Sequence, residues 1–285
     1  MRFSLILCTL NRDKEVREFL SSLVTQDYDN FEVIIVDQNS DARVKNIVNE
    51  FNTLDIKYLK SEKGLSRSRN VGLLHVNGDV VAFPDDDCLY PPHLLKDINE
   101  LFLSNDFHIL TGKTIDKSTG VIVAGKNILT SQYLSPTNIL GSSTTLFIKR
   151  ENNIEISFDE RFGLGAIFNS EEENELIFRL LKLGFKGYYS PDLNYVYHPP
   201  SDLDLKDISR VQQRTIGLGA FIAKHLFSKE GLVYFVKYNL LRPPVAIILF
   251  TLRFDFVKVR YYLNRWIGIW KGFIKYYKVK YETAF

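Results

Sequence analysis

The sequence is poor in cysteine: Cys8 and Cys88 are its two thiols in 285 residues. Secreted domains that depend on disulfides need a larger set of paired cysteines, so this chain has no disulfide framework, and a reducing compartment is expected. With 45% hydrophobic residues, the chain is long enough to bury a substantial core. Its length fits one large domain, or one domain with an appendage.

Long apolar runs are also missing. The N-terminal run ends by Leu10 and meets Asn11-Arg12-Asp13, so it is too short for a signal peptide and predicts a strand instead. No segment reaches the roughly 18 uninterrupted apolar residues that cross a bilayer. The best candidate is Val245 to Leu252, and we expect Pro243-Pro244 before it and Arg253 after it to stop the apolar helix. The sequence therefore predicts no ordinary transmembrane helix.

A glycine-rich phosphate loop is absent from the start of the chain. No G-x-G-x-x-G follows the first predicted strand, and Ser4–Arg12 contains no glycine. Dinucleotide-dependent oxidoreductases need such a loop so that backbone amides can approach the pyrophosphate. This class of enzyme is therefore disfavoured.

The net charge of +2 hides two parts of opposite sign. Residues 1–230 hold 26 Lys and Arg against 32 Asp and Glu, a net charge of −6, whereas residues 231–285 hold 10 against 2, a net charge of +8. A nucleic-acid partner would favour a basic field along the whole chain, so no nucleic acid is expected. Positive charge confined to an aromatic-rich tail predicts contact with an anionic membrane surface.

The first hundred residues alternate short apolar runs with amphipathic segments. This is a βαβ pattern and predicts an α/β fold with an open, mainly parallel sheet flanked by helices. The expected strands and helices are, in order, Phe3–Thr9, Lys14–Thr25, Phe31–Asp37, Ala42–Phe51, Ile56–Leu59, Ser66–His75 and Val80–Phe83.

From about residue 107 the pattern is mixed. Residues 1–204 are expected to form one catalytic domain, with halves of about 1–110 and 111–204, and residues 205–285 a helical C-terminal extension. The further expected elements are strands at Phe107–Thr111, Gly120–Ala124 and Ser143–Ile148, a helix at Glu172–Leu183, and a strand at Gly187–Tyr197.

The tail contains a basic amphipathic helix. Its apolar residues recur every three or four positions, with lysines and arginines among them, which is typical of helices that lie in a membrane interface. The same face could pack on the catalytic domain or on a second subunit, so a homo-oligomer remains open. The apolar positions are Val259, Leu263, Trp266, Trp270, Phe273 and Tyr277.

Three consecutive carboxylates, Asp85, Asp86 and Asp87, follow the strand predicted at Val80–Phe83. Adjacent carboxylates repel one another, so a divalent cation that neutralises them explains their proximity. Hard oxygen ligands without a cysteine cluster favour Mg²⁺ or Mn²⁺, which share coordination with substrate phosphates. A solvated acidic turn is the alternative.

Two further features lie upstream of the triplet. Arg67 and Arg69 lie in the segment that opens a predicted helix, where they suit a phosphate or a neighbouring carboxylate, although an exposed basic face has the same sequence. Asp37 ends a strand, where it can accept hydrogen bonds from a base or ribose or act as a polar strand cap.

Four segments in order resemble the family 2 glycosyltransferases of the GT-A fold. They are Cys8–Arg12, Val36–Asp41, Gly64–Gly72 and Phe83–Asp87, and the resemblance spans about residues 3–200. One departure is Leu10, where many relatives have proline; this alters a turn and removes no reactive group.

The resemblance implies a nucleotide-sugar site and a metal site. Thr9 and Asp37 would contact the base, Asp85 would lie near the ribose, and Arg67 near the donor. Asp87, the last acidic residue of the D-x-D motif, would ligate Mn²⁺ or Mg²⁺, with Asp85 and His198 as further candidate ligands. The residues assigned to the nucleotide-sugar are Thr9, Asn11, Arg12, Asp37, Ser40, Arg67, Asn70, Asp85 and Asp86.

The second half supplies the acid–base candidate. Glu171-Glu172-Glu173 opens a predicted helix, and matching the family's acidic pair places the general base at Glu173, with Glu172 next. A carboxylate suits the task, because an acceptor hydroxyl must lose its proton as the bond forms. The same residues also stabilise a helix N-terminus. His198 similarly allows a second interpretation, as a hydrogen-bonded strand-end histidine.

The resemblance implies an inverting transfer of a sugar, with a UDP-sugar as the expected donor, that forms a β-linkage from an α-linked donor. A lipid-linked or growing surface glycan is the expected acceptor, and the basic tail predicts a cytoplasmic enzyme on the inner face of the cell membrane. Two rival interpretations are a sugar-nucleotide nucleotidyltransferase, which should show a Gly-rich N-terminal phosphate loop, and a non-catalytic glycan-binding protein.

Overall fold

The computed structural model describes residues 1–124, 128–151, 154–193, 195–199 and 208–282, and these fall into two compact units. The first unit comprises Met1–Phe158 and Leu176–Ser201, and the second Asp159–Glu175 and Asp202–Phe285. The domain boundary predicted between residues 204 and 205 lies outside the described residues. Asp159–Glu175, expected in the acceptor half of the catalytic domain, groups with the C-terminal helices.

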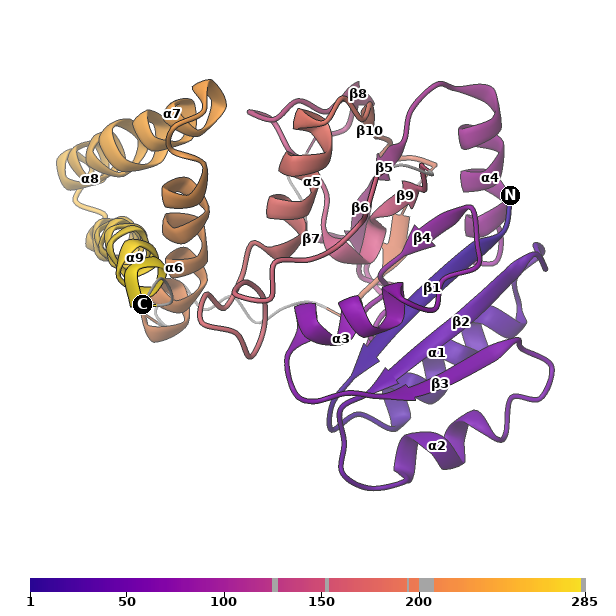
Figure 1. Ribbon diagram of the computed structural model, residues 1–285. Helices are drawn as coiled ribbons and strands as arrows, with labels where there is room; N and C mark the ends of the chain where they lie inside the picture. The colour runs from indigo at the N-terminus through magenta and orange to yellow at the C-terminus, as the bar shows by residue number, and fades with distance from the viewer. Residues whose placement is uncertain (125–127, 152–153, 194, 200–207, 283–285) are drawn as a thin grey trace. The chain divides into compact units, whose positions relative to one another are not determined.

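The first unit is an α/β structure, and Figure 1 shows its strands and helices alternating in the N-terminal part of the chain. Its first elements are β1 (Phe3–Thr9), α1 (Lys14–Val24), β2 (Phe31–Asp37), α2 (Arg43–Val48), β3 (Ile56–Lys60), α3 (Leu65–Leu73), β4 (Val80–Ala82) and α4 (Leu94–Ser104). They are followed by β5 (Ile109–Thr111), β6 (Lys113–Ile115), β7 (Ile122–Ala124), β8 (Gln132–Tyr133), a 3₁₀ turn η1 (Ser143–Thr145), β9 (Phe147–Lys149), α5 (Glu172–Lys182), β10 (Gly187–Tyr189) and β11 (Tyr195–Tyr197).

The strands form two sheets. An eight-stranded sheet has the order β3-β2-β1-β4-β9-β5-β10-β8, and a three-stranded sheet has the order β11-β6-β7. Strands β1 to β4 pair in parallel, whereas β9 runs antiparallel to β4 and β5. The predicted mainly parallel sheet is therefore confirmed.

Helices cover both faces of the parallel strands, because alternate residues of a strand point to opposite faces. Leu5 and Leu7 of β1 belong to the core cluster that includes α1, α2 and α4. On the other face, a Cβ at Gly72 of α3 would lie 2.5 Å from Cγ2 of Ile6. Glycine at this position lets α3 approach β1 closely.

Two strand predictions are wrong in part. The predicted strand Ser143–Ile148 begins as the 3₁₀ turn η1, and only β9, Phe147–Lys149, is a strand. Gly187–Tyr197 is not a single strand but is divided between the two sheets, with β10 parallel to β5 and β11 parallel to β6. A turn at Pro191–Leu193 separates them. Proline cannot donate a ladder hydrogen bond, which explains the break, and the turn carries the chain to the second sheet.

Where the structure describes it, the second unit is mainly helical apart from residues 159–171. Its elements are the beginning of α5, α6 (Ile208–His225), α7 (Lys229–Phe235), a π-helical turn η2 (Val236–Leu241), α8 (Arg242–Leu252) and α9 (Phe256–Glu282). Asp159 and Glu175 are joined by Lys224 of α6, whose Nζ lies 2.7 and 2.5 Å from their carboxylates. This buried ion-pair cluster fixes Asp159–Glu175 to α6.

The expectation that Pro243-Pro244 would interrupt the apolar segment is wrong. Residues Lys229–Leu252 form one helical stretch, long and apolar enough by length and composition to cross a membrane, with 17% of its most apolar window buried. The prolines lie in the first turn of α8, where a missing N–H costs least, and the π-helical turn precedes them.

Helices α6 and α9 pack through glycines. A Cβ at Gly272 of α9 would lie 1.9 Å from the carbonyl oxygen of Ile216, and one at Gly219 of α6 would lie 1.9 Å from that of Ile269. Both distances are far shorter than any non-bonded contact. The two backbones therefore approach to a distance that only glycine permits.

We expect Gly272→Ala to lower the free energy of unfolding by about 1–3 kcal/mol, because the added methyl group must push α9 away from α6. Arg260→Ala, an exposed change on the same helix, is the control and should alter it by less than about 0.5 kcal/mol. Urea unfolding followed by circular dichroism measures both. Equal stability of Gly272→Ala and the wild type would contradict this packing.

Candidate active site

Three polar positions meet at one edge of the parallel sheet. Thr9 ends β1, Asp37 ends β2, and Asp85–Asp87 follow β4. The parallel pairing of β1 with β2 and β4 brings these ends together, as expected for ligand sites in open α/β sheets. Thr9 Oγ1 donates a hydrogen bond to Asp86 Oδ2 at 2.7 Å, so the segment Cys8–Arg12 directly contacts the acidic triplet.

Asp85, Asp87 and His198 form a candidate metal site. One ligand atom from each lies within 4.8 Å of the others, and His198 Nε2 is 3.2 Å from Asp87 Oδ1. His198 follows β11, and the backbone bridge between Leu89 and Tyr197 holds that strand beside the loop after the triplet. Two carboxylates and an imidazole suit Mn²⁺ or Mg²⁺, so the residues present fit the predicted cation.

The three carboxylates of the triplet are not electrostatically equivalent. Burial raises the pKa of Asp86 to about 6, against the opposing hydrogen bond from Thr9. The hydrogen bond with His198 holds the pKa of Asp87 below its usual range, although burial acts in the other direction. Arg12 assists, with Nη1 3.1 Å from Asp87 Oδ2. These contacts keep Asp87 ionised, as a metal ligand must be.

His198 is held by the same contact. Burial favours its neutral form, but the hydrogen bond to Asp87 outweighs that effect and raises the His198 pKa. Its Nδ1 lies 2.6 Å from the carbonyl oxygen of Pro199, so both ring nitrogens have partners. The Pro199 contact orients the ring and leaves Nε2 facing the carboxylates.

Arg69 contacts the triplet. The sequence suggested this arginine for a phosphate or a neighbouring carboxylate, although Arg67 alone was assigned to the donor. Arg69 is 1% exposed, its Nη2 lies 3.3 Å from Asp85 Oδ1, and its guanidinium lies 5.8 and 5.2 Å from the ring centres of Phe83 and Phe158. Arg67 instead forms an exposed ion pair of 2.6 Å with Glu62. In this structure α3 contacts the triplet through Arg69. A contact between Arg67 and the nucleotide-sugar donor stays a prediction.

Asn70 and Asn11 have structural partners. The side-chain amide of Asn70 donates to the Phe158 carbonyl at 2.9 Å and accepts from the Phe158 N–H at 2.8 Å, so it anchors that segment. Asn11 has a left-handed backbone, with φ of 58°, and its N–H donates to Asn39 Oδ1. Their predicted contacts with a nucleotide-sugar stay predictions.

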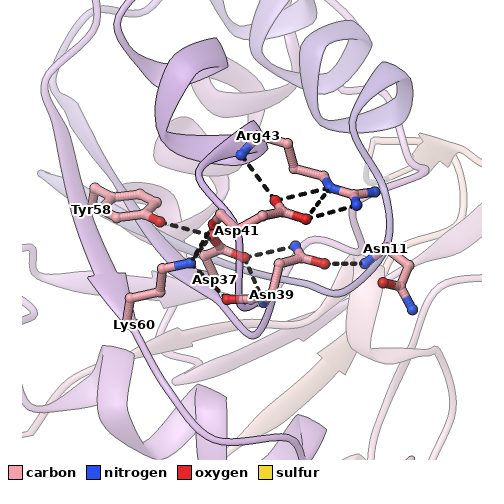
Figure 2. A network of polar contacts seen from close by, with 7 residues as sticks. All are labelled: Asn11, Asp37, Asn39, Asp41, Arg43, Tyr58 and Lys60. Atoms are coloured by element: carbon pink, nitrogen blue, oxygen red, sulfur yellow. Dashed lines mark hydrogen bonds and ion pairs between the residues drawn. The ribbon is translucent and has the colours of Figure 1, made fainter.

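Asp37 lies at the centre of a polar network (Figure 2). Its side chain is fully buried, and Oδ1 accepts from the N–H and the side-chain amide of Asn39, while Oδ2 accepts from Tyr58 and Lys60. Burial would raise the pKa of Asp37, but these hydrogen bonds, that of Lys60 foremost, lower it.

Four hydrogen bonds occupy all the lone-pair sites of a carboxylate. A base that bonded directly to Asp37, as the family resemblance implies, would therefore have to displace one of these donors. Lys60 also donates to the carbonyl oxygens of Asn39 and Asp41, on either side of the exposed Ser40. Asp37 and Lys60 thus shape the loop that contains Ser40.

Sequence reasoning missed Asn39, Tyr58 and Lys60 as parts of this site. The available signal was the register of the sheet, in which Asp37 is paired with Lys60 at the shared ends of β2 and β3. That register depends on strand ends that sequence patterns locate only to within a few residues.

The predicted acid–base residues lie in the second unit. Glu172 and Glu173 form the first turn of α5, where Glu172 is buried and Glu173 half-buried. Glu171 precedes them with a left-handed backbone, φ 74°, and burial raises its pKa to about 7. The acid–base role of Glu173 or Glu172 stays a prediction.

A cavity of about 480 Å³ lies beside the metal candidate in the first unit. Arg12, Asp87 and His198 line it, together with Lys14 of α1 and Lys117. Its size is that of a small-molecule site. The cavity is therefore large enough for a ligand that carries phosphate.

The comparisons with known proteins agree with this geometry. Residues 4–163 match the model of glycosyl transferase family 2. Poly(ribitol-phosphate) beta-N-acetylglucosaminyltransferase TarS of Staphylococcus aureus is 37% identical over 212 residues, which cover 66% of this chain and 35% of TarS. The chain spans between 27% and 62% of the length of the first curated relatives.

Solved structures share the fold. The mannosyltransferase PcManGT from Pyrobaculum calidifontis, in complex with GDP-Man and Mn²⁺, gives a TM-score of 0.66 at 14% identity and covers 96% of this chain and 86% of that one. TarS 1–349 from S. aureus, in complex with UDP-GlcNAc, gives 0.56 at 18% identity and covers 91% and 90%.

The family match covers more than half of the chain and contains all four segments that carried the resemblance. The GT-A fold is likewise confirmed by the structural neighbours. The chain therefore belongs to glycosyl transferase family 2.

Proposed function

We propose that this glycosyltransferase moves a sugar from a nucleotide-sugar, with a UDP-sugar as donor, to a hydroxyl of a lipid-linked or growing surface glycan, with inversion at the anomeric carbon. The convergence of Asp85, Asp87 and His198 at the carboxyl edge of the sheet carries the proposal. A diphosphate leaving group needs positive charge at this position. The donors named for TarS and PcManGT, UDP-GlcNAc and GDP-Man, are both of this class.

Asp87, Asp85 and His198 would hold Mn²⁺ or Mg²⁺, which supplies positive charge to the departing diphosphate. The chain's own cations add to that charge. Arg12 lies beside Asp87, and Lys14 and Lys117 line the adjoining cavity. Arg69 holds Asp85 from the buried side, so the carboxylate keeps one orientation.

Glu173 acts as the general base and takes the proton of the acceptor hydroxyl. The hydroxyl oxygen bonds to the anomeric carbon as the bond from that carbon to the diphosphate breaks, on the opposite face of the sugar. An α-linked donor then gives a β-linked product. Glu172 is the alternative base, because it lies in the same first turn of α5.

The C-terminal unit attaches the enzyme to the cytoplasmic face of the membrane. Exposed apolar side chains gather along α8 and the start of α9, at Leu241, Val245, Ile248, Leu249, Leu252, Phe254, Phe256 and Val257. The residue range 231–285 has a net charge of +8, which complements anionic lipids.

An interfacial position is favoured over a membrane span. Lys237 and Arg242 fall in the middle of the helical stretch Lys229–Leu252. A charged side chain at the centre of a bilayer costs about 2.5–3.5 kcal/mol or more. A helix lying in the interface keeps both charges in contact with headgroups.

Asp87→Ala should lower metal-dependent hydrolysis of UDP-sugars at least about a hundredfold, because the ionised ligand is lost. Asp106→Ala, at an exposed carboxylate far from β4 in the sequence, is the matched control and should leave the rate unchanged. A donor screen across UDP-, GDP- and dTDP-sugars, with Mn²⁺, Mg²⁺ or a chelator, measures the rate and identifies the nucleotide. Unaltered hydrolysis by Asp87→Ala would exclude the proposed metal site.

Glu173→Gln should lower the rate of transfer about 10²- to 10⁴-fold while donor affinity stays the same, because the amide cannot accept the hydroxyl proton. Glu172→Gln is the comparison variant and should retain more activity. Transfer kinetics and donor titration separate the two effects. If Glu172→Gln were the inactive variant, the base would be Glu172; if both were active, the base would be another residue.

The pair of changes Ile248→Asp and Leu249→Asp should release the 285-residue chain from vesicles that contain anionic phospholipid, because both residues are exposed on α8. Leu103→Asp, an exposed apolar residue of the first unit, is the control. Co-sedimentation measures binding. If the α8 pair instead abolished self-association and left vesicle binding intact, the apolar face would be a subunit interface.

A further inference from the structure

A second cavity, of about 290 Å³, lies wholly within the C-terminal unit. Its polar walls are Tyr238 of η2, Arg242 of α8, and Tyr262 and Arg265 of α9; Pro243 and Ile269 are apolar parts of its lining. None of these residues was assigned to the reaction. Two guanidinium groups and two phenol rings around a small space are the chemistry of an anion site with an apolar border.

The two arginines of this cavity contact tyrosines. Among the described residues, no carboxylate oxygen forms an ion pair with either guanidinium, and each instead contacts a tyrosine. Arg242 Nη1 is 3.5 Å from the Tyr238 hydroxyl, and Arg265 Nη1 is 3.0 Å from that of Tyr261. Arg12, Arg69 and Arg161, by contrast, each form an ion pair with an aspartate.

The surroundings compensate this positive charge only in part, through the interaction of Arg265 with the carboxyl group of Glu171. Burial lowers the pKa of Lys237, and the charge of Arg242 lowers it further. The nearby acid, Glu171, has its pKa raised to about 7 by burial, so it is only partly ionised at neutral pH. An anion bound between the arginines would relieve the repulsion among the three cations.

The backbone at this place is also unusual. The cavity adjoins the π-helical turn η2, and π-helical turns are rare and frequently occur at functional sites. Asn239 in that turn is fully buried, and both polar atoms of its side chain lack a hydrogen-bond partner. A buried amide without partners opposes folding, so this turn is not arranged for stability alone.

We propose that this cavity binds the phosphate of an anionic lipid headgroup while the apolar residues of α8 enter the same leaflet. The proposal rests on the membrane contact of the proposed function and deepens it by naming a specific site. Guanidinium groups bind phosphate through paired N–H donors, and basic pockets between helices at a membrane surface recognise lipid headgroups.

The neighbouring residues favour a lipid over a soluble phosphate. Arg242 is flanked along the chain by the exposed Leu241 and, three residues on, by the exposed Val245. A phosphate bound at Arg242 therefore lies next to exposed apolar surface, whose hydration is unfavourable. A lipid supplies both the phosphate and the acyl chains that cover this surface.

The test uses the full chain and vesicles of phosphatidylcholine with or without phosphatidylglycerol. The central variant is Arg242→Lys with Arg265→Lys, which keeps both charges but loses the paired donors. We expect this pair to bind phosphatidylglycerol vesicles about tenfold more weakly than the wild type. Affinity equal to the wild type would mean that only diffuse charge attracts the membrane, and would overturn the proposal.

A matched pair of neutralising variants gives a second measure. Arg253→Gln with Arg260→Gln removes two exposed charges from the same unit, and each should weaken binding about fivefold, as for any surface cation near an anionic membrane. Arg242→Gln with Arg265→Gln should weaken binding several times more than this control. Equal losses would again overturn the proposal. Thermal melting of each variant checks that it is folded.

Two further outcomes would show which of the proposals is wrong. If the wild type bound neither kind of vesicle but still hydrolysed UDP-sugar, both this proposal and the membrane attachment would fail, and the transferase proposal would stand. If inorganic phosphate stabilised the wild type but not the lysine pair, and phosphatidylglycerol did not distinguish them, the ligand would be a soluble phosphate. That result would overturn the lipid assignment.

Discussion

The parallel hydrogen bonding of β1 to β2 on one side and to β4 on the other is the constraint on which the catalytic unit depends. It places Thr9, Asp37 and the acidic triplet at one edge of the sheet, although almost eighty residues separate the first from the last. The hydrogen bond from Thr9 to Asp86 joins two of these strand ends directly. The sheet thus creates a concentration of negative charge that buried cations and a histidine must offset.

The groups that offset this negative charge differ from one aspartate of the triplet to the next. Arg69 offsets Asp85 from within the core, between two phenyl rings, whereas Arg12 and His198 offset Asp87 from the cavity side. Asp86 is offset least, and burial therefore raises its pKa to about 6. Three chemically identical side chains in succession therefore have three different environments. The pKa of Asp87 is lowered and that of Asp86 is raised, so Asp87 is better suited than Asp86 to bind a cation.

Much of this could be predicted from the sequence. The βαβ pattern located β1 to β4 because apolar runs bounded by polar loops have few other interpretations. The acidic triplet and Asp37 were selected because carboxylates at strand ends have recognisable chemistry, whereas His198 was selected through the family resemblance. The sequence could not show that Arg69, rather than Arg67, contacts the acidic triplet. Two arginines two residues apart on α3 point in different directions, and the sequence does not define which one faces the core.

Other features depended on tertiary structure. The division of Gly187–Tyr197 into two strands follows from the positions of β5 and β6, which lie more than seventy residues upstream. The continuity of α7, η2 and α8 through two prolines depends on a π-helical turn, for which the sequence has no known signature. Likewise, the close approach of α6 to α9 becomes evident only when the glycines of both helices are seen facing a neighbouring carbonyl.

The network around Asp37 has a consequence for how this site can evolve. Asp37, Tyr58 and Lys60 come from two adjacent strands, and Tyr58 and Lys60 donate to the buried carboxylate of Asp37. A substitution that removes the ammonium group of Lys60 takes the cation away from that buried carboxylate, which is costly in a low-dielectric environment. A change at Lys60 is therefore coupled to the residue at position 37. A lineage that replaced Lys60 would have to supply another cation from β3 or abandon the carboxylate at the end of β2.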